Sequence, residues 1–366
     1  MTDLLRPIEI LRPNRIEFGP GLAPLVGQWA AERRLNRVLV IAGRTNAARI
    51  DALGLKGEVT VFGEVKPEPD IPNLDAALAI AARVKPDLVI GFGGGSALDL
   101  AKLVAVLPGS GQTIHDVVGP EKVNGRRVTL VQVPTTAGTG SEAGTRSLIT
   151  DPATQAKLAV QSRHILADLA VIDPDLMLSV PPAVTAATGV DALAHCVEAF
   201  TSRRAHPAID LYVLEGIRLV GRYLPRAVKD GADREARAGL ALASLYGGYG
   251  LGPVNTTAGH AVAYPLGTRH HVAHGLACAV IFPHTLAWNA PAAPEKTEAV
   301  LSALGTKDAY AWCAALGIEM GLSGLGVPEA DLPVMAKEAH AIRRLLDNNP
   351  RDISEAEILA LYRRAY

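Results

Sequence analysis

Short apolar runs alternate with helical periodicity through the first half of the chain. Runs of four to eight apolar residues that end at glycine or proline favour buried strands, and a 3.6-residue repeat between them favours amphipathic helices. The elements expected are strands at 37–43, 59–65, 87–96 (running into a glycine turn) and 128–136, helices at 73–84 and 98–107, and a hairpin over 148–160. Asn73 is the expected cap of the first helix, and the hairpin is expected to turn at Asp151 and Pro152. Strands that alternate with helices predict a parallel sheet.

After Pro181 and Pro182 the pattern changes, and only the helical period remains. The segments with that period are 182–202, 206–220, 233–250, 274–288, 306–321 and 352–366. The sequence therefore predicts an α/β N-terminal domain with a parallel sheet over residues 1–180, and an all-α C-terminal domain over residues 181–366.

Composition narrows the class of protein. The net charge is −1 and no long run of like charge occurs, which argues against nucleic acid or anionic lipid as a partner. The three cysteines have no paired spacing, which favours a reducing compartment. Neither a signal peptide nor an apolar stretch of about 20 residues is evident. We expect a cytoplasmic protein with no membrane or nucleic-acid partner.

Two polar turns follow consecutive predicted strands. The segment GFGGGSALDLAK (91–102) leaves a strand and opens a helix, where glycines allow close approach and free N–H groups attract a pyrophosphate. It is not the full G-x-G-x-x-G pattern, and such turns are often only tight turns. The segment PTTAGTGSE (134–142) follows the next strand and adds hydroxyl groups. Because open α/β sheets bind ligands at the carboxyl ends of their strands, the pair indicates nucleotide binding.

Histidine is concentrated in one stretch, GHAVAYPLGTRHHVAHG (259–275), which holds four of the ten histidines. A metal site, a surface cluster and a helix end are all compatible with it. Asp191 and His195 are four residues apart in an apolar helix and share one face, and a buried carboxylate needs a partner. With His260 and His274 the set becomes one carboxylate and three imidazoles, which suits Fe²⁺ or Zn²⁺ and leaves room for a substrate oxygen.

The chain resembles the iron-containing (group III) alcohol dehydrogenase family over nearly its whole length. The resemblance rests on IEFGPG, GGGSALDLAK, PTTAGTGSE, DALAHCVEAF, GHAVAYPLGTRHHVAHGLACAVIFPH and the closing NNPRDISEAEILALYRRAY. It implies a divalent metal, most naturally Fe²⁺ with Zn²⁺ as the alternative, bound by Asp191, His195, His260 and His274. It implies NAD or NADP with its pyrophosphate on Gly93, Gly94, Gly95 and Ser96, flanked by Thr135, Thr136, Thr139 and Lys157.

The same resemblance implies an activity and an assembly. A hydride passes between the nicotinamide and a carbinol carbon in a cleft between the domains, and the metal acidifies the alcohol or polarises the carbonyl. The substrate is a small alcohol or carbonyl compound, and the assembly is expected to be a homodimer.

The chain departs from the family pattern at two positions. Many members carry a proton-relay histidine four residues after the third ligand, where this chain has Tyr264. Tyr264, His270 or His271 could take over that catalytic role, although both histidines could equally be solvated or line the cleft. Members that prefer NAD often end the first strand with Asp, whereas this chain has Gly43 and Arg44. Losing the carboxylate removes repulsion toward a 2′-phosphate, which makes NADP use plausible.

Arg146 stands shortly after the threonine-rich turn, near where the resemblance places nicotinamide and substrate. A buried guanidinium needs a partner. That partner is either Glu142, four residues earlier, or an anionic group on the substrate. In the second case Arg269, His270 and His271 would widen the positive patch. The predicted function is a metal-dependent, NAD(P)-linked alcohol dehydrogenase or carbonyl reductase, with a short anionic substrate as the finer hypothesis.

Three alternatives accompany this interpretation. A maleylacetate reductase belongs to the same superfamily but typically lacks the complete ligand set. A lyase resembling dehydroquinate synthase shares the architecture but needs more basic residues than the motifs carry. A non-catalytic metal or nucleotide sensor would show no turnover.

Overall fold

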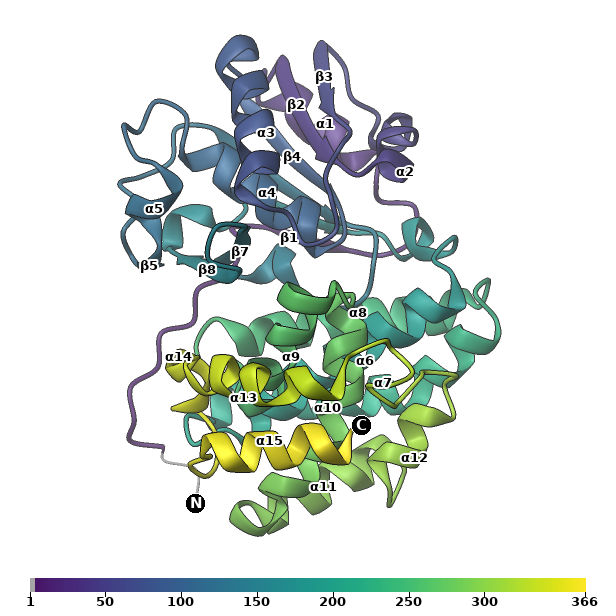
Figure 1. Ribbon diagram of the computed structural model, residues 1–366. Coiled ribbons are helices and arrows are strands. Elements are labelled where there is room, and N and C mark those ends of the chain that lie inside the picture. Colours follow the sequence, from purple (N-terminus) through teal and green to yellow (C-terminus); the bar gives the residue numbers. More distant parts are fainter. Residues whose placement is uncertain (1–3) are drawn as a thin grey trace. The chain divides into compact units, whose positions relative to one another are not determined.

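The computed structural model describes residues 4–366, which form two compact units (Figure 1). The α/β unit comprises Leu11–Thr136 and Gly140–Leu178. The helical unit comprises Ser179–Tyr366, the segment Ala137–Thr139 and the described residues before Leu11. Because of these last two segments, the observed units are not separated by a single boundary at residue 180, as the predicted domains are. The predicted fold class, a parallel α/β unit followed by a helical unit, is confirmed.

The α/β unit is built on a six-stranded parallel sheet with the strand order β1-β9-β6-β4-β2-β3. Its strands are β1 (Ile16–Phe18), β2 (Arg37–Ala42), β3 (Glu58–Phe62), β4 (Leu88–Gly93), β6 (Thr129–Pro134) and β9 (Leu169–Ile172). A smaller sheet holds β5 (Gly119–Pro120), β7 (Arg146–Asp151) and β8 (Ala156–Gln161). The helices are α1 (Leu25–Glu32), α2 (Arg44–Ala47), α3 (Ile71–Val84), α4 (Gly95–Val106) and α5 (Ile114–Val117).

Alternate residues of the central strands enter two separate cores, one on each face of the large sheet. In β2, Val38 and Val40 join one buried cluster, whereas Leu39 and Ile41 join the other. The period of two follows from the pleat of a strand. A parallel sheet covered on both faces requires apolar residues at successive positions, and this requirement explains the continuous run RVLVIA in β2.

The predicted strands at 37–43, 59–65, 87–96 and 128–136 correspond to β2, β3, β4 and β6, and the predicted hairpin is the antiparallel pair β7–β8. The prediction that Asn73 caps its helix is wrong. The cap is Asp70, whose side-chain oxygen accepts the backbone N–H of Asn73 at 2.8 Å. Pro72 lies in the first turn, where its missing N–H costs nothing, so the helix begins upstream of Asn73.

The helical unit contains most of the remaining helices. They are α6 (Pro182–Thr201), α7 (Pro207–Lys229), α8 (Arg234–Leu251), α9 (Ala258–His270), α10 (His274–Asn289), α11 (Pro294–Leu304), α12 (Ala309–Ala314), α13 (Leu332–His340), α14 (Arg343–Leu346) and α15 (Glu355–Arg364). The predicted helix over 306–321 is confirmed only for α12, because the chain turns at Gly317, which has a φ of +79°. None of the helices in the described part of the chain is long and apolar enough to cross a membrane.

Helix α6 lies at the centre of the helical unit and packs against α7, α8 and α10. Most of its residues are buried, including the ionisable side chains of Asp191, His195 and Glu198. Charged groups that are taken out of water need partners of opposite charge or hydrogen bonds. The three buried side chains of α6 therefore need charged or hydrogen-bonding partners inside the protein.

Candidate metal centre and glycine turn

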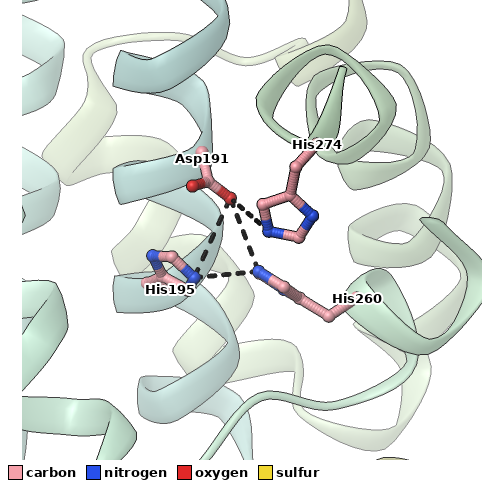
Figure 2. A group of neighbouring side chains, drawn as sticks. All are labelled: Asp191, His195, His260 and His274. Carbon is pink, nitrogen blue, oxygen red and sulfur yellow. Dashed lines mark hydrogen bonds and ion pairs between the residues drawn. The ribbon is translucent and has the colours of Figure 1, made fainter. Parts of the chain in front are cut away.

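Four side chains from three helices converge in the helical unit (Figure 2). Asp191 and His195 lie one turn apart on α6, His260 lies on α9, and His274 is the first residue of α10. From Asp191 Oδ1 the distances are 3.8 Å to His195 Nε2, 3.5 Å to His260 Nε2 and 3.6 Å to His274 Nε2. All four donor atoms lie within 4.8 Å of one another, so one ion can meet all of them.

Among the described residues, one donor atom of this cluster lacks the hydrogen-bond partner that a buried polar group needs. Asp191 Oδ1 is buried without a hydrogen-bond partner. His195 Nε2 and His260 Nε2 lie 2.9 Å apart. Their Nδ1 atoms face acceptors, which are Gly138 O at 3.3 Å and Glu198 Oε1 at 2.6 Å. Because an Nδ1 that donates leaves a lone pair on Nε2, two lone pairs and a carboxylate oxygen face one point. A divalent cation fits this donor set.

The electrostatics favour the metal-binding form of two residues of the cluster, His195 and Asp191. The pKa of His260 is instead raised against its burial by Cys278, Glu198 and Asp191, so an ion bound there would displace a proton. Burial lowers the pKa of His195 to about 4, so its imidazole is neutral at pH 7. Burial alone would raise the pKa of Asp191, but its interactions with the neighbouring imidazoles outweigh that effect and hold the pKa well below its usual range. Metal binding requires neutral imidazoles and ionised carboxylates.

Glu198 supports the cluster from outside and was not predicted from the sequence. Its Oε1 accepts from His260 Nδ1, and its Oε2 accepts from the backbone N–H of Thr257 at 2.6 Å and from the hydroxyl of Thr257 at 3.0 Å. A Cβ at Gly259 would lie 2.6 Å from Glu198 Oε1, so glycine is required there. The carboxylate both fixes the ring of His260 and satisfies the first turn of α9. Although burial raises the pKa of Glu198, the charge of His260 and these hydrogen bonds hold it below its usual value.

A second side chain missed by the sequence reasoning is Cys278, one turn after His274 on α10. The thiol is buried, and its Sγ lies 3.8 Å from His274 Nε2. In the sequence it is one of three cysteines without paired spacing, and nothing in that spacing indicates a contact with the ligand set.

Of the three residues suggested for proton relay, the structure brings Tyr264 to the ligands. Its ring centroid lies 6.4 Å from that of His260 and 6.0 Å from that of His274. His270 instead has its Nε2 3.4 Å from a carboxylate oxygen of Asp331. His271 is exposed and ends α9 in a left-handed conformation, with a φ of 55°.

Helix α4 begins where β4 ends, and the glycine turn joins them. Gly93 closes β4, Gly94 caps α4, and the helix starts with Gly95 and Ser96. A Cβ on Gly93 would lie 2.8 Å from the Cβ of Ala97, and one on Gly94 would lie 3.2 Å from Thr136 Oγ1. The turn is therefore tight enough to require glycine, and it exposes the N–H groups of a helix N-terminus, where anions bind.

The threonine turn is tied to the glycine turn within the α/β unit. The backbone N–H of Thr135 donates to Gly93 O at 2.9 Å, and its hydroxyl accepts from Asn46 Nδ2 at 3.1 Å. The backbone hydrogen bond from Thr135 to Gly93 places the two polar turns side by side at these residues. Thr139 belongs to the short segment assigned to the helical unit.

The remaining residues predicted for the cofactor differ in their surroundings. Gly43 caps α2, and the nearest atom to an added Cβ would be Val65 O at 3.6 Å, so a side chain fits there. Arg44 is exposed and lies 3.8 Å from Glu64 Oε1. Lys157 is engaged inside the unit, where its Nζ contacts Glu68 and donates to Thr150 Oγ1 at 2.9 Å.

Arg146 lies at the start of β7, and its Nε donates to the side-chain oxygen of its cross-strand neighbour Gln161 at 3.2 Å. Glu142 is buried, which raises its pKa to about 7, and the charge that acts against this shift is that of Lys102. The buried ammonium of Lys102 donates to Ser141 O at 2.7 Å and to Arg146 O at 2.6 Å. Lys102 forms its ion pair with Asp99, at 3.6 Å, and acts on Glu142 only through its charge.

Two family comparisons together cover nearly all of the chain. Residues 13–174 match "Iron-containing alcohol dehydrogenase", and residues 185–366 match "Fe-containing alcohol dehydrogenase family, C-terminal". The chain belongs to the iron-containing alcohol dehydrogenase family and is an oxidoreductase acting on CH–OH groups. The predicted pair of cofactors, a divalent metal and a nicotinamide dinucleotide, is that of this family.

The similar proteins differ in their named substrates. The chain is 38% identical to long-chain-alcohol dehydrogenase 1 of Geobacillus thermodenitrificans (strain NG80-2), over 84% of this chain and 82% of that protein. It is 33% identical to 1,3-propanediol dehydrogenase of Klebsiella pneumoniae, over 99% of both chains. It is 34% identical to sulfoacetaldehyde reductase of Bilophila wadsworthia (strain 3_1_6), over 83% of both chains.

Solved structures extend the likeness to the whole fold. The sulfoacetaldehyde reductase of Bifidobacterium kashiwanohense, in complex with NAD⁺, matches with a TM-score of 0.87 and 29% identity, over 98% of this chain and 99% of that chain. The maleylacetate reductase of Agrobacterium tumefaciens matches with a TM-score of 0.83 and 27% identity, over 99% of both chains. The fold is thus shared by enzymes that act on neutral and on anionic substrates.

Proposed function

We propose that this protein is a metal-dependent, NAD(P)-linked dehydrogenase that interconverts a small alcohol and its aldehyde or ketone. The observation that carries the proposal is the orphaned oxygen of Asp191, surrounded by three imidazole nitrogens at 3.5 to 3.8 Å. A bound divalent ion supplies Lewis acidity, which polarises a carbonyl or acidifies an alcohol. Fe²⁺ is the ion proposed, with Zn²⁺ as the alternative.

The residues of the helical unit have separate tasks in this proposal. Asp191, His195, His260 and His274 hold the ion, and Glu198 fixes the ring of His260. Tyr264 stands beside the ligand imidazoles with its phenolic oxygen as the group that exchanges a proton with the substrate oxygen. Burial raises the pKa of Tyr264, but the guanidinium of Arg344 and the charges of His260 and His274 lower it below its usual value. A lowered pKa brings a phenol nearer to the working range of an acid–base catalyst.

The α/β unit has the task of binding the dinucleotide. The glycine turn from Gly93 to Ser96 takes the pyrophosphate, and Thr135 and Thr136 border it. When bound, the nicotinamide donates or accepts the hydride. Thr139, Lys157, Gly43 and Arg44 complete the proposed contacts with the cofactor.

The complete set of one carboxylate and three imidazoles favours this function over the alternatives. A maleylacetate reductase shares the fold but typically lacks the full set. A lyase like dehydroquinate synthase needs a denser group of basic residues, and a sensor needs no catalytic metal. The test is a panel of alcohols and carbonyl compounds, assayed with NADH and NADPH after reconstitution with Fe²⁺ or Zn²⁺. Turnover supports the proposal, and a panel without any turnover contradicts it.

We expect NADPH to be used at least as well as NADH, because Gly43 lacks the carboxylate that would repel a 2′-phosphate. A Gly43→Asp variant should shift the ratio of kcat/KM values toward NADH by about tenfold or more, since a carboxylate there accepts ribose hydroxyls and repels phosphate. The open space at Gly43 lets the new side chain fit. Gly43→Ala is the matched control, and it should leave the ratio unchanged. A parent enzyme that is strongly selective for NADH would contradict this expectation.

We also propose that the substrate carries an anionic group, with Arg146 as one residue that recognises it. If so, the parent should turn over 4-oxobutanoate better than butanal, which has the same chain length. Arg146→Ala should then lower kcat/KM for the anion by about tenfold, the value of one charge-assisted hydrogen bond. Equal losses on both aldehydes would mean that Arg146 acts only through its contact with Gln161.

The proposed setting is a cytoplasmic homodimer that acts on small molecules and has no nucleic-acid or membrane partner. Light scattering on the purified protein tests the assembly directly.

A further inference from the structure

The cationic side chains on the helices around the metal centre are mostly neutralised by acids. Arg269 forms two hydrogen bonds with Glu338, at 2.7 and 2.6 Å. His270 lies against Asp331. Arg343 forms an ion pair with Asp347 one turn later. The positive patch expected around Arg269, His270 and His271 therefore has two of its three members paired with carboxylates.

Arg344, the residue after Arg343, contacts an aromatic ring instead of a carboxylate. Its guanidinium carbon lies 5.6 Å from the ring centroid of Tyr264. Among residues 4–366 no carboxylate forms an ion pair with it. Arg344 is exposed, whereas Tyr264 is only 7% exposed. A charge with no acidic partner is thus placed at the surface above a buried phenol.

Tyr264 connects this cation with the metal centre. The phenol ring lies one helical turn after His260 and 6.0 Å from the ring of His274. Arg344, Tyr264 and the four metal ligands all belong to the helical unit. The juxtaposition of cation and metal centre is therefore internal to one compact unit.

A guanidinium that rests on an aromatic ring keeps donors available for another partner. Its interaction with the ring is weak at an exposed site. Arg has five N–H donors in a planar fork that matches carboxylate and sulfonate oxygens in pairs. The ring contact and one side-chain hydrogen bond with Tyr264 leave most of that capacity unused.

We infer that Arg344 binds an anionic group of the substrate, a carboxylate or a sulfonate, and that this protein therefore reduces short carbonyl compounds that carry such a group. The inference rests on the proposed function. In the reaction the carbonyl carbon gains a hydride from NAD(P)H and the oxygen gains a proton, while the anionic group is unchanged. Arg344 positions the substrate from the unit that holds the metal, whereas Arg146 belongs to the α/β unit.

The experiment compares 4-oxobutanoate with butanal, using full-length enzyme reconstituted with Fe²⁺ or Zn²⁺ and saturated with the better of NADPH and NADH. Arg344→Gln should lower kcat/KM for 4-oxobutanoate by about 10- to 100-fold more than that for butanal, chiefly through KM. Any effect of the variant on the pKa of Tyr264 should lower kcat for both aldehydes alike, so the ratio of the two kcat/KM values reports anion recognition. Arg344→Lys should recover part of the loss, because it keeps the charge without the fork. Arg343→Gln is the matched control, since Arg343 is already paired with Asp347, and it should leave the kcat/KM values of both substrates unchanged.

A second readout separates recognition from folding. The product analogue succinate should inhibit the parent and should inhibit Arg344→Gln about tenfold less, with melting temperatures unchanged. Equal losses on both aldehydes, or a parent that does not prefer the anion, overturn the inference and leave the proposed function standing. Turnover of neither aldehyde, together with failure across the wider panel, overturns the proposed function and the inference with it.

Discussion

His260→Ala is expected to leave the protein without its divalent ion and to lower kcat/KM by about 10³-fold or more, the value of several kcal/mol of Lewis-acid stabilisation. The imidazole is central to the cluster, because its Nε2 lies 3.5 Å from Asp191 Oδ1 and 2.9 Å from His195 Nε2. Alanine removes one donor of four and leaves the Glu198 carboxylate without its strongest partner. His195→Ala and His274→Ala should act in the same direction.

The measurement is the metal content per chain of anaerobically prepared protein, determined by elemental analysis alongside the kinetics. His115→Ala is the control, since His115 is exposed on α5 in the other unit and should change neither quantity. If His260→Ala and His274→Ala bind the ion as tightly as the parent, the assignment of the ligands is wrong.

Glu198→Gln is the second change with a large expected effect, although the residue does not belong to the ligand set. Supporting carboxylates of this kind typically contribute 10- to 100-fold in metal affinity, so we expect a loss of about that size. A glutamine keeps the shape but loses the charge that stabilises the donated Nδ1–H of His260. It also offers an amide where Thr257 and His260 both need an acceptor.

The affinity is measured by competition with a chelator of known metal affinity. Glu295→Gln, at an exposed position in the first turn of α11, is the matched control. Metal affinity of Glu198→Gln equal to that of the parent would show that Glu198 serves only the start of α9.

The large sheet and the central helices follow from local patterns. The strand RVLVIA could be predicted from its continuous run of apolar residues. The glycine turn after β4 could be predicted because its glycines are adjacent in the sequence. Helix α9 was not predicted, because its apolar and polar residues do not segregate to opposite faces and Pro265 lies inside it. Burial of nearly its whole first half by tertiary packing holds it helical.

The residues of the candidate site also fall into those that the sequence predicted and those that it did not. Asp191 and His195 are paired by the turn of one helix, so four residues of sequence suffice to bring them together. His260 and His274 come from the histidine-rich stretch 259–275, in which only the family resemblance distinguishes them from His270 and His271 as ligands. Glu198 and Arg344 were not found, because their contacts depend on helices that lie far apart in the sequence. Glu198 meets Thr257 across 59 residues, and Arg344 meets Tyr264 from α14.

The four metal ligands and Glu198 all belong to the helical unit, whereas the glycine turn belongs to the α/β unit. The residues proposed for the metal and those proposed for the dinucleotide therefore stand in different compact units. A substitution at Gly43, proposed to set the nucleotide preference, would replace none of the proposed metal ligands, and a substitution among those ligands would leave the glycine turn unchanged. A recombinant that joins the α/β unit of one relative to the helical unit of another would exchange one specificity at a time.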